Sequence, residues 1–328
     1  SVAVDLFGPI EFQGTVNKRQ TGKGWGVIFV CSASSAVHVE FTDSYSTNGF
    51  LLALRRFMCA RGTPSRIQSD RGEQLVAASK QVQSWDCKEV MEWAGSKGIE
   101  WHLVPTGGQH FNGQAERAVG LMKKQLARVL EGRRFSYEEI NTVLQEAAQI
   151  VNGRPLAAGN GTTGEQGTVP ICPAQLLIGR ATAGVPQVNL QEGNKLTSRL
   201  QAVEEVKKEF WDQWVKEAFP AWLKQGKWKK ECRDVQVGDV VLRKDETAAG
   251  ATYKYARVIK VHPGKDGHVR SADVEYRIPG EKGFRVTTRP VHKLVMIVPK
   301  EEQEGAPEES TSSSSEDETE DEIEVEIR

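Results

Sequence analysis

Short, mostly apolar runs separated by polar turns open the chain and predict β-strands. The first run, VAVDLF at residues 2–7, contains almost no polar side chains and ends at Gly8-Pro9, so it is expected to be a central strand buried on both faces. The next two runs follow after short connections, which predicts an antiparallel meander. Two later runs predict further strands. The five expected strands are residues 2–7, 25–31, 37–41, 65–70 and 99–104.

Apolar residues that recur at helical spacing occupy the intervals between and after these strands. The first helix is expected to be capped by Thr47 and to stop at Gly62. Ser136 with Glu139 predicts a capping box at the start of a later helix. The other expected helical segments are residues 74–80, 86–96, 115–130 and 196–214.

The chain is organised around residues 105–131, where a glycine-rich polar loop runs into an amphipathic helix. Glu116 lies near the start of this helix, at the margin of its apolar stripe. Lys123 falls within about 20° of Glu116 two turns later, so a carboxylate and an ammonium group share one edge of the helix. A solvated edge of a core helix is the alternative explanation for a single glutamate. The stripe consists of Ala115, Ala118, Val119, Met122, Leu126, Val129 and Leu130.

The apolar period changes to two from Val235 onward. Several short strands with tight turns, one of them expected at Asp266-Gly267, predict a small SH3-like β-barrel. The aromatic residues of the preceding amphipathic helix, Trp211 and Trp214 among them, are expected to pack helix on helix. The expected organisation is a core at residues 1–155, a linker with amphipathic helices at 156–234, the barrel at 235–300 and a disordered acidic tail at 301–328.

The net charge of −1 hides a strong asymmetry. Residues 301–328 hold 13 acidic residues and one arginine, whereas residues 1–300 hold 42 Lys and Arg against 31 Asp and Glu. Residues 224–300 alone hold 18 Lys and Arg against 9 Asp and Glu. This excess predicts a polyanionic partner, with protein binding as the alternative for a small basic barrel. The candidate phosphate-binding residues before the barrel are Lys227, Lys229 and Lys230.

Several classes of protein and site are excluded by what the sequence lacks. The sequence contains no apolar run of about 18 residues, so no membrane span is expected. No P-loop, GxGxxG or GxSxG motif occurs. The chain begins at Ser1 inside a strand-like run without a signal peptide, so it is expected to be a fragment or a processed polyprotein product. Five scattered cysteines without a CxxC pair argue against a disulfide framework and a zinc site, and indicate reduced, buried thiols in an intracellular protein.

Three carboxylates are candidates for a metal-binding, catalytic role. Asp5 lies in the middle of a buried strand, where an unpaired carboxylate costs several kcal/mol. Asp70 ends the strand at 65–70, where open α/β sheets place their sites, although an Asp-x-Gly alone is usually only a turn. Together with Glu116 they offer hard oxygen ligands for two Mg²⁺ or Mn²⁺ ions held about 3.5 to 4 Å apart. This is a ribonuclease H-like arrangement, and it predicts an α/β fold with a five-stranded mixed sheet. His38 is expected to be a satisfied core histidine.

The series D…SD-x-G…NGQAER, followed by a basic VGDVVL segment, resembles the DDE integrases of retroviruses and LTR retrotransposons. The surrounding sequence, over residues 2–299, is similar to that of a Bel-Pao type retrotransposon integrase with its catalytic core and C-terminal domain. The resemblance implies that Asp5, Asp70 and Glu116 are the metal ligands and that Lys123 holds the DNA end of the element. The segments that carry it include VAVDLFGPI, GVIFVC, AVHVEF, RGTPSRIQSD, LLIGRA, FWDQW, PGKDGHVR and RPVHKLV.

This chain also departs from the family pattern. Arg71 follows the second aspartate where the family usually has asparagine. The 45 residues between Asp70 and Glu116 make a longer interval than retroviral integrases have. No His-His-Cys-Cys set for the N-terminal zinc-binding domain of the family occurs in these residues.

The function implied by the resemblance is metal-dependent removal of terminal nucleotides from element DNA, followed by attack of the new 3′-OH on target DNA. Asn112 and Gln114 are expected to position DNA. The implied cofactor is a pair of Mg²⁺ or Mn²⁺ ions. The implied partners are element ends, target DNA, further copies of the chain and chromatin, without a membrane, and the implied location is the nucleus after a cytoplasmic particle stage. The alternatives are a ribonuclease H-like nuclease and a domesticated protein that only binds DNA or chromatin.

Overall fold

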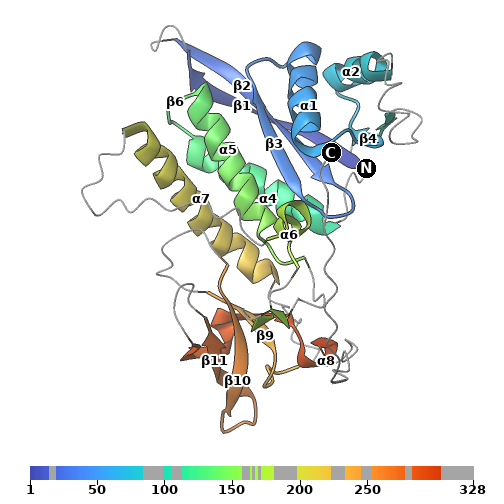
Figure 1. Cartoon of the computed structure of the whole chain (residues 1–328). Helices are drawn as coiled ribbons and strands as arrows, with labels where there is room; N and C mark the ends of the chain where they lie inside the picture. The colour runs from blue at the N-terminus through green and yellow to red at the C-terminus, as the bar shows by residue number, and fades with distance from the viewer. Residues whose placement is uncertain are drawn as a thin grey trace, which may run out of the picture.

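The computed structural model describes residues 1–14, 20–83, 99–104, 113–156, 163–164, 167–168, 171–180, 198–222, 233–244, 253–277 and 283–303. Figure 1 shows a mixed α/β part, an antiparallel sheet at the other end of the molecule, and the long helix α7 (Ser198–Trp222) running from one toward the other.

The first sheet is mixed, as the sequence predicts. Its strands lie in the order β3-β2-β1-β4-β5, with the short β6 paired to the end of β1. The first three strands form an antiparallel meander, whereas β4 runs parallel to β1 and β5 parallel to β4. This order and these directions fit a ribonuclease H-like core. The strands are β1 (Val2–Gln13), β2 (Thr21–Cys31), β3 (Val37–Thr42), β4 (Arg66–Ser69), β5 (Glu100–Leu103) and β6 (Phe135–Ser136).

Helices cover both faces of this sheet, and the alternation of side chains along β2 explains why. Val27 and Phe29 pack with α1 (Thr47–Arg61) and α2 (Glu73–Gln83) on one face. Ile28 and Val30 join the larger core on the other face, where α4, α5 and α7 pack. Successive strand residues point to opposite faces, so a continuous apolar run is what a strand between two helical layers requires. The covering helices are α4 (Gly113–Leu130) and α5 (Tyr137–Asn152).

Among the element boundaries that differ from the sequence expectation, two have a clear local cause. β1 continues past Gly8-Pro9 to Gln13, because a bulge between Phe7 and Ile10 absorbs the irregular residues. Gly8 has a φ of 138°, which side chains rarely tolerate. The N-cap of α1 is Ser46 rather than Thr47, since its side chain accepts a hydrogen bond from the amide of Gly49 at 3.1 Å. The capping box of Ser136 and Glu139 is confirmed.

The outer edge of β3 is covered by side chains of α5. The Asn152 side chain bonds both the N–H and the C=O of Val37, each at 2.7 Å. Gln145 donates to the carbonyl of Val39, and the Tyr137 hydroxyl donates to that of Phe41 at 2.8 Å. These contacts satisfy backbone groups that would otherwise leave an open sheet edge.

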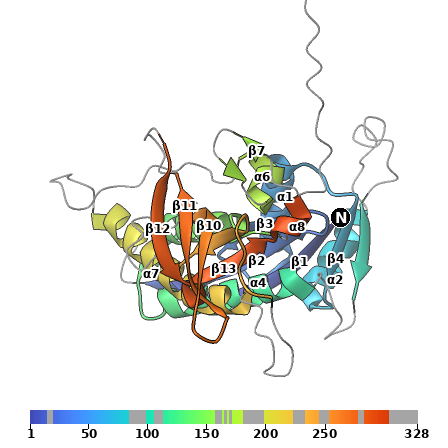
Figure 2. The same ribbon diagram turned by 90° about the horizontal axis from the view of Figure 1, so that it is seen from below.

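The second sheet is antiparallel, with five strands in the order β12-β11-β10-β9-β13. A turn with Gly267 at a φ of 81° joins β10 and β11, which confirms the hairpin expected at Asp266-Gly267. The pairings run along an open path from β12 to β13, so closure into an SH3-like barrel stays a prediction. Figure 2 shows these strands from below. They are β9 (Val240–Arg243), β10 (Tyr255–Pro263), β11 (Val269–Tyr276), β12 (Arg285–Pro290) and β13 (Leu294–Val298).

Helix α7 packs against both parts of the molecule. Its aromatic residues Phe210, Trp211 and Trp214 are at most 6% exposed and belong to the core shared with α4 and α5, which confirms the expected helix packing. Near the end of α7, Phe219 packs with Leu242 of β9 and Val295 of β13. The remaining short elements are β7 (Thr163–Gly164), β8 (Gly167–Thr168), α6 (Pro173–Ile178), the 3₁₀ turn Val291–Lys293 and α8 (Lys300–Gln303).

Tyr253, just before β10, joins the two parts by hydrogen bonds. Its hydroxyl accepts from the indole N–H of Trp214 at 2.8 Å and donates to the carbonyl of Ile150 at 3.0 Å. Burial raises the pKa of this phenol, so it stays protonated and able to donate.

Tyr253→Phe is expected to destabilise the chain by about 1–2 kcal/mol, because the indole N–H of Trp214 and the carbonyl of Ile150 each lose one buried hydrogen bond. Urea unfolding monitored by circular dichroism measures the change. Tyr45→Phe is the matched control, since Tyr45 is 51% exposed and should be close to neutral. Equal stability of the two variants would show that the contact at Tyr253 contributes nothing.

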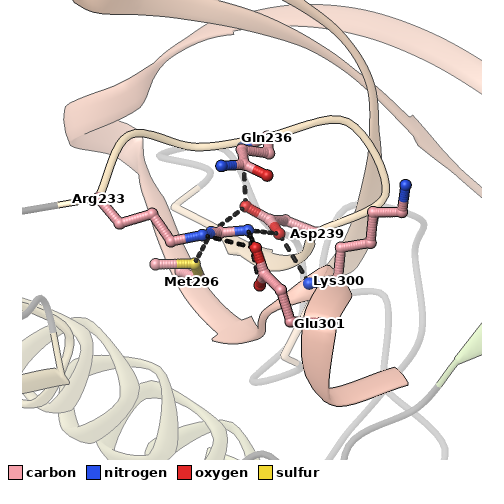
Figure 3. A network of polar contacts seen from close by, with 6 residues as sticks. All are labelled: Arg233, Gln236, Asp239, Met296, Lys300 and Glu301. Atoms are coloured by element: carbon pink, nitrogen blue, oxygen red, sulfur yellow. Dashed lines mark hydrogen bonds and ion pairs between the residues drawn. The ribbon is translucent and has the colours of Figure 1, made fainter. Parts of the chain in front are cut away.

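A buried ion pair fixes the start of β9 and the end of the second sheet (Figure 3). Asp239 is 0% exposed, and both of its oxygens accept from the Arg233 guanidinium at 2.9 Å. The same carboxylate accepts from the amides of Gln236 at 2.8 Å and Lys300 at 2.9 Å. Arg233 also contacts Glu301 of α8 at 2.9 Å, so α8 is attached to the sheet.

Three of the cysteines lie in the described parts of the chain, and all three are free thiols. Only Cys172 is buried, because Cys31 is half-buried and Cys59 lies on the exposed surface of α1, so the expectation of buried thiols was wrong for these two. Among the helices that the structure describes, none is long and apolar enough to cross a membrane.

Candidate functional site

Asp5 and Asp70 occupy neighbouring positions of two parallel strands. β1 and β4 pair in register with Val4 opposite Ser69, which is the pair directly before the two aspartates. Val2, Val4 and Ile67 face α1 and α2. By alternation, Asp5 points to the opposite face, where α4 lies, and Asp70 continues the same face as it leaves β4. The two backbones are therefore roughly 5 Å apart where they carry these carboxylates.

Asp70 also makes the local turn expected of an Asp-x-Gly sequence. One oxygen of its carboxylate accepts from the amide of Gly72 at 3.0 Å. The adjacent Ser69 hydroxyl accepts from the indole of Trp101 at 2.9 Å, which ties the end of β4 to β5. The turn uses one carboxylate oxygen of Asp70, so the other oxygen can still bind a metal ion.

Helix α4 reaches the same place from the other direction. All seven residues of its predicted apolar stripe are buried against the sheet and α5, so the helix is held close to the end of β1. Lys123 extends from α4 to form an ion pair with Asp5. The side chain of Asp5 is 35% exposed and that of Lys123 is 22% exposed, so this contact lies at the rim of the core. Glu116 lies in the first turn of the same helix.

The donor chemistry of this site suits a hard divalent cation. Aspartate oxygens at adjoining strand positions are the ligands that Mg²⁺ and Mn²⁺ prefer. The carboxylate of Asp5 already pairs with the ammonium group of Lys123, so it lies where a positive charge is stabilised. No group of three or more His, Cys, Asp or Glu side chains gathers in metal-binding geometry within the described residues, and Glu116 is not drawn into one with the two aspartates.

A hollow of about 590 Å³ lies between the bulge of β1 and the C-terminal half of α4, and Lys123 is the member of the site that lines it. The bulge of β1 at Gly8 and Pro9 forms one wall, and Lys123, Lys124 and Arg133 contribute positive charge to the other side. Sequence reasoning missed this hollow, because the predicted strand ended where the bulge begins. The only sequence signal for it is Gly8-Pro9 followed by further apolar residues.

The cations on the remaining face of α4 are engaged with α7. Lys124 and Arg128 both contact Glu217 at 2.7 Å. The hydrogen bond from Lys124 is the main reason that the pKa of Glu217 is lowered to about 2. Their partner lies about ninety positions later in the sequence, so no local sequence pattern indicates this contact.

His38 is a core residue, as expected, but among the described residues only its Nε2 has a hydrogen-bond partner, so the expectation of a satisfied histidine holds for one ring nitrogen. Its Nε2 lies 2.8 Å from Glu40, which in turn accepts from Arg56 at 2.6 Å. Burial raises the pKa of Glu40, but the bonds to His38 and Arg56 outweigh it and the net shift is downward.

The other predicted DNA contacts lie outside what the structure describes. Asn112 precedes the first described residue of α4, and the side chain of Gln114 is likewise undescribed. The same holds for Lys227, Lys229 and Lys230, within the interval 223–232. Their roles stay predictions.

Comparison with known proteins gives one family and a set of similar structures. Residues 198–297, which span α7 and most of the second sheet, match a family of unknown function, DUF5641. No curated protein matches the sequence.

Similar solved structures include retroviral integrases. A simian T-cell lymphotropic virus intasome in complex with PP2A regulatory subunit B56 gamma is 12% identical, with 90% of this chain and 78% of that chain covered and a TM-score of 0.34. The HTLV-2 integrase catalytic core domain in complex with magnesium, in its trimeric form, is 18% identical, with 48% and 87% covered and a TM-score of 0.29. The dimeric form of that domain is also 18% identical, with 39% and 70% covered and a TM-score of 0.25.

Proposed function

We propose that this protein is a polynucleotidyl transferase of the DDE class, the integrase of an LTR retrotransposon of Bel-Pao type. The observation that carries the proposal is the placement of Asp5 beside Asp70 on the sheet face covered by α4, with Lys123 of that helix in contact with Asp5. A carboxylate pair and a cation converge there from three separate elements, and the cation, Lys123, also lines the hollow of about 590 Å³.

The roles follow from the charges. Asp5, Asp70 and Glu116 would hold two Mg²⁺ or Mn²⁺ ions, which when bound activate an attacking oxygen and stabilise the leaving one. Asp5 lies on the central strand β1, between β2 and β4. Lys123 lies at the rim, so its ammonium can bind a phosphate of a DNA end placed over the carboxylates. Asn112 and Gln114 precede Glu116 and would position the same end.

The remainder of the proposal concerns partners and location. The basic residues at 224–300 would bind DNA along its phosphates, and copies of the chain would assemble around two DNA ends. An enzyme that joins element DNA to chromosomal DNA would act in the nucleus, after a cytoplasmic particle stage, with chromatin as a further partner.

A strand-transfer assay with a short duplex that mimics an element end tests the proposal. Joined products that require Mg²⁺ or Mn²⁺ are the expected result. Cleavage without joining would point instead to a nuclease with the same fold. DNA binding without either reaction, also after the zinc-binding domain of the family is supplied, would point to a protein that only binds DNA.

Lys123→Ala is expected to weaken binding of DNA ends about tenfold, which corresponds to about 1.4 kcal/mol for one charge-assisted phosphate contact. The slope of log K against log salt should fall by about 1. Fluorescence anisotropy at several salt concentrations measures both quantities. Lys124→Ala is the matched control, because its neighbouring ammonium contacts Glu217 of α7 instead of Asp5. The positioning role is wrong if the two variants bind DNA ends equally well.

A further inference from the structure

Strand β12 is an edge strand with exposed apolar side chains. It lies at the end of the sheet order, paired with β11 on one side. Val286 is 58% exposed, and Phe284, two residues earlier, is 55% exposed. Residues two apart along a strand share a face, so these side chains form one apolar surface at the margin of the sheet.

The opposite face of β12 is positively charged. Arg285 and Arg289 alternate with the apolar positions, and their cross-strand neighbours on β11 are Tyr276 and Ala272. In the described part of the chain, no strand pairs with the outer side of β12. An edge strand with exposed apolar side chains can pair with one more strand. Because Arg285 and Arg289 lie on this edge, a strand with acidic residues is favoured.

The chain itself contains a segment with the matching pattern. Its last residues, EIEVEIR at 322–328, alternate strictly between acidic and β-branched apolar residues. In an extended conformation Ile323, Val325 and Ile327 share one face, while the three glutamates share the other. The rest of the tail is acidic and serine-rich and lacks this alternation.

We propose that residues 322–328 add to the second sheet as a strand paired with the free edge of β12. An antiparallel register places Val325 beside Val286 and Ile327 beside Phe284. On the other face the same register places Glu326 beside Arg285 and Glu322 beside Arg289. Both the apolar contact and the two charge pairs stabilise cross-strand neighbours. A parallel strand with Val325 beside Val286 would bring Ile323 beside Phe284, but it would also place Arg328 beside Arg289. Repulsion between these like charges disfavours the parallel register.

The tail is long enough to reach this edge. It starts after α8, which Arg233 and Asp239 hold against the sheet through Glu301 and Lys300 (Figure 3). The interval between Gln303 and residue 322 has a root-mean-square span of about 25 Å for a flexible chain. Five strand spacings, from β13 to the added strand beyond β12, are about 24 Å. The added strand would cover positive charge that the sheet offers to DNA, so the tail would compete with nucleic acid for this surface.

Hydrogen–deuterium exchange on the full chain tests the proposal. The amides of β12 are expected to exchange at least tenfold more slowly in the intact chain than in a chain ending at residue 303. Val325→Lys should match the truncated chain, because it places a charge on the apolar face of the added strand. Thr311→Lys is the control with the same type of charged side chain elsewhere in the tail, and it should match the intact chain.

Two outcomes would overturn the proposal. One is equal exchange of β12 in the intact and truncated chains. The other is protection that disappears on dilution, which would assign the added strand to a second copy. Cross-linking of a Val286→Cys, Val325→Cys double variant, mapped by mass spectrometry, checks the pairing directly. A Thr287→Cys, Val325→Cys variant places the thiols on opposite faces and should cross-link less.

Discussion

Asp5→Asn is expected to abolish metal-dependent strand transfer, with a loss of at least a thousandfold, or about 4 kcal/mol in transition-state stabilisation. The amide keeps the shape of the side chain but removes the negative charge that a divalent cation requires at the centre of the site. Measured joined products per unit time, with Mg²⁺ and then with Mn²⁺, give the effect. DNA binding should stay nearly unchanged, because the contacts to phosphates come from cations.

The fold should tolerate this substitution. The ion pair between Asp5 and Lys123 is partly exposed on both sides, so its loss should change the free energy of unfolding by no more than about 1 kcal/mol. Asp212→Asn on the exposed side of α7 is the control with the same chemical change. Strand transfer that survives in the Asp5 variant would remove the basis for the proposed function, whereas equal loss in both variants would indicate a general defect of the preparation.

Asp239→Asn is expected to destabilise the second sheet by about 2–3 kcal/mol. The substitution leaves the Arg233 guanidinium facing a neutral group in a place where the carboxylate is 0% exposed. Arg233 is 27% exposed and retains Glu301, which keeps the loss below that of a fully buried pair. Native-state hydrogen exchange of amides in β9 and β13 reports the opening free energy of this sheet.

Glu301→Gln separates the buried from the exposed part of this network. Glu301 contacts the same guanidinium but its side chain is 59% exposed, so solvent screens this pair and its replacement should cost clearly less than that of Asp239. If Asp239→Asn and Glu301→Gln lower the opening free energy equally, the buried carboxylate of Asp239 contributes no more to stability than the exposed one of Glu301.

The contribution of Asp239 should also depend on pH. Burial raises the pKa of this carboxyl, but the hydrogen bonds from Arg233, Gln236 and Lys300 outweigh burial, so the net shift is downward. A group with a lowered folded-state pKa contributes stability that is fully present above its unfolded value, about 3.9, and is lost as the pH falls through the folded value. The difference between the wild type and Asp239→Asn should therefore shrink below about pH 4.

Local patterns in the sequence determined most of the elements. The five strands of the first sheet, the apolar stripe of α4 and the capping box at Ser136 depend on the spacing of residues within a few turns or a single strand. Such short-range preferences act wherever the segment lies in the fold, so the helices and strands that they favour can be predicted from the sequence alone. The same holds for the opposite charges of the body and the tail.

Tertiary structure decided how these elements meet. The register of β1 and β4 places Asp5 beside Asp70, and Lys123 contacts Asp5 across 118 positions of sequence. Asn152 covers the edge of β3, and Tyr253 ties the second sheet to α5 and α7. Each of these contacts depends on two segments being packed against a common core, which no local period encodes. The carboxylates could therefore be chosen from the sequence, whereas their proximity follows only from the parallel pairing of two strands and the packing of α4 across them.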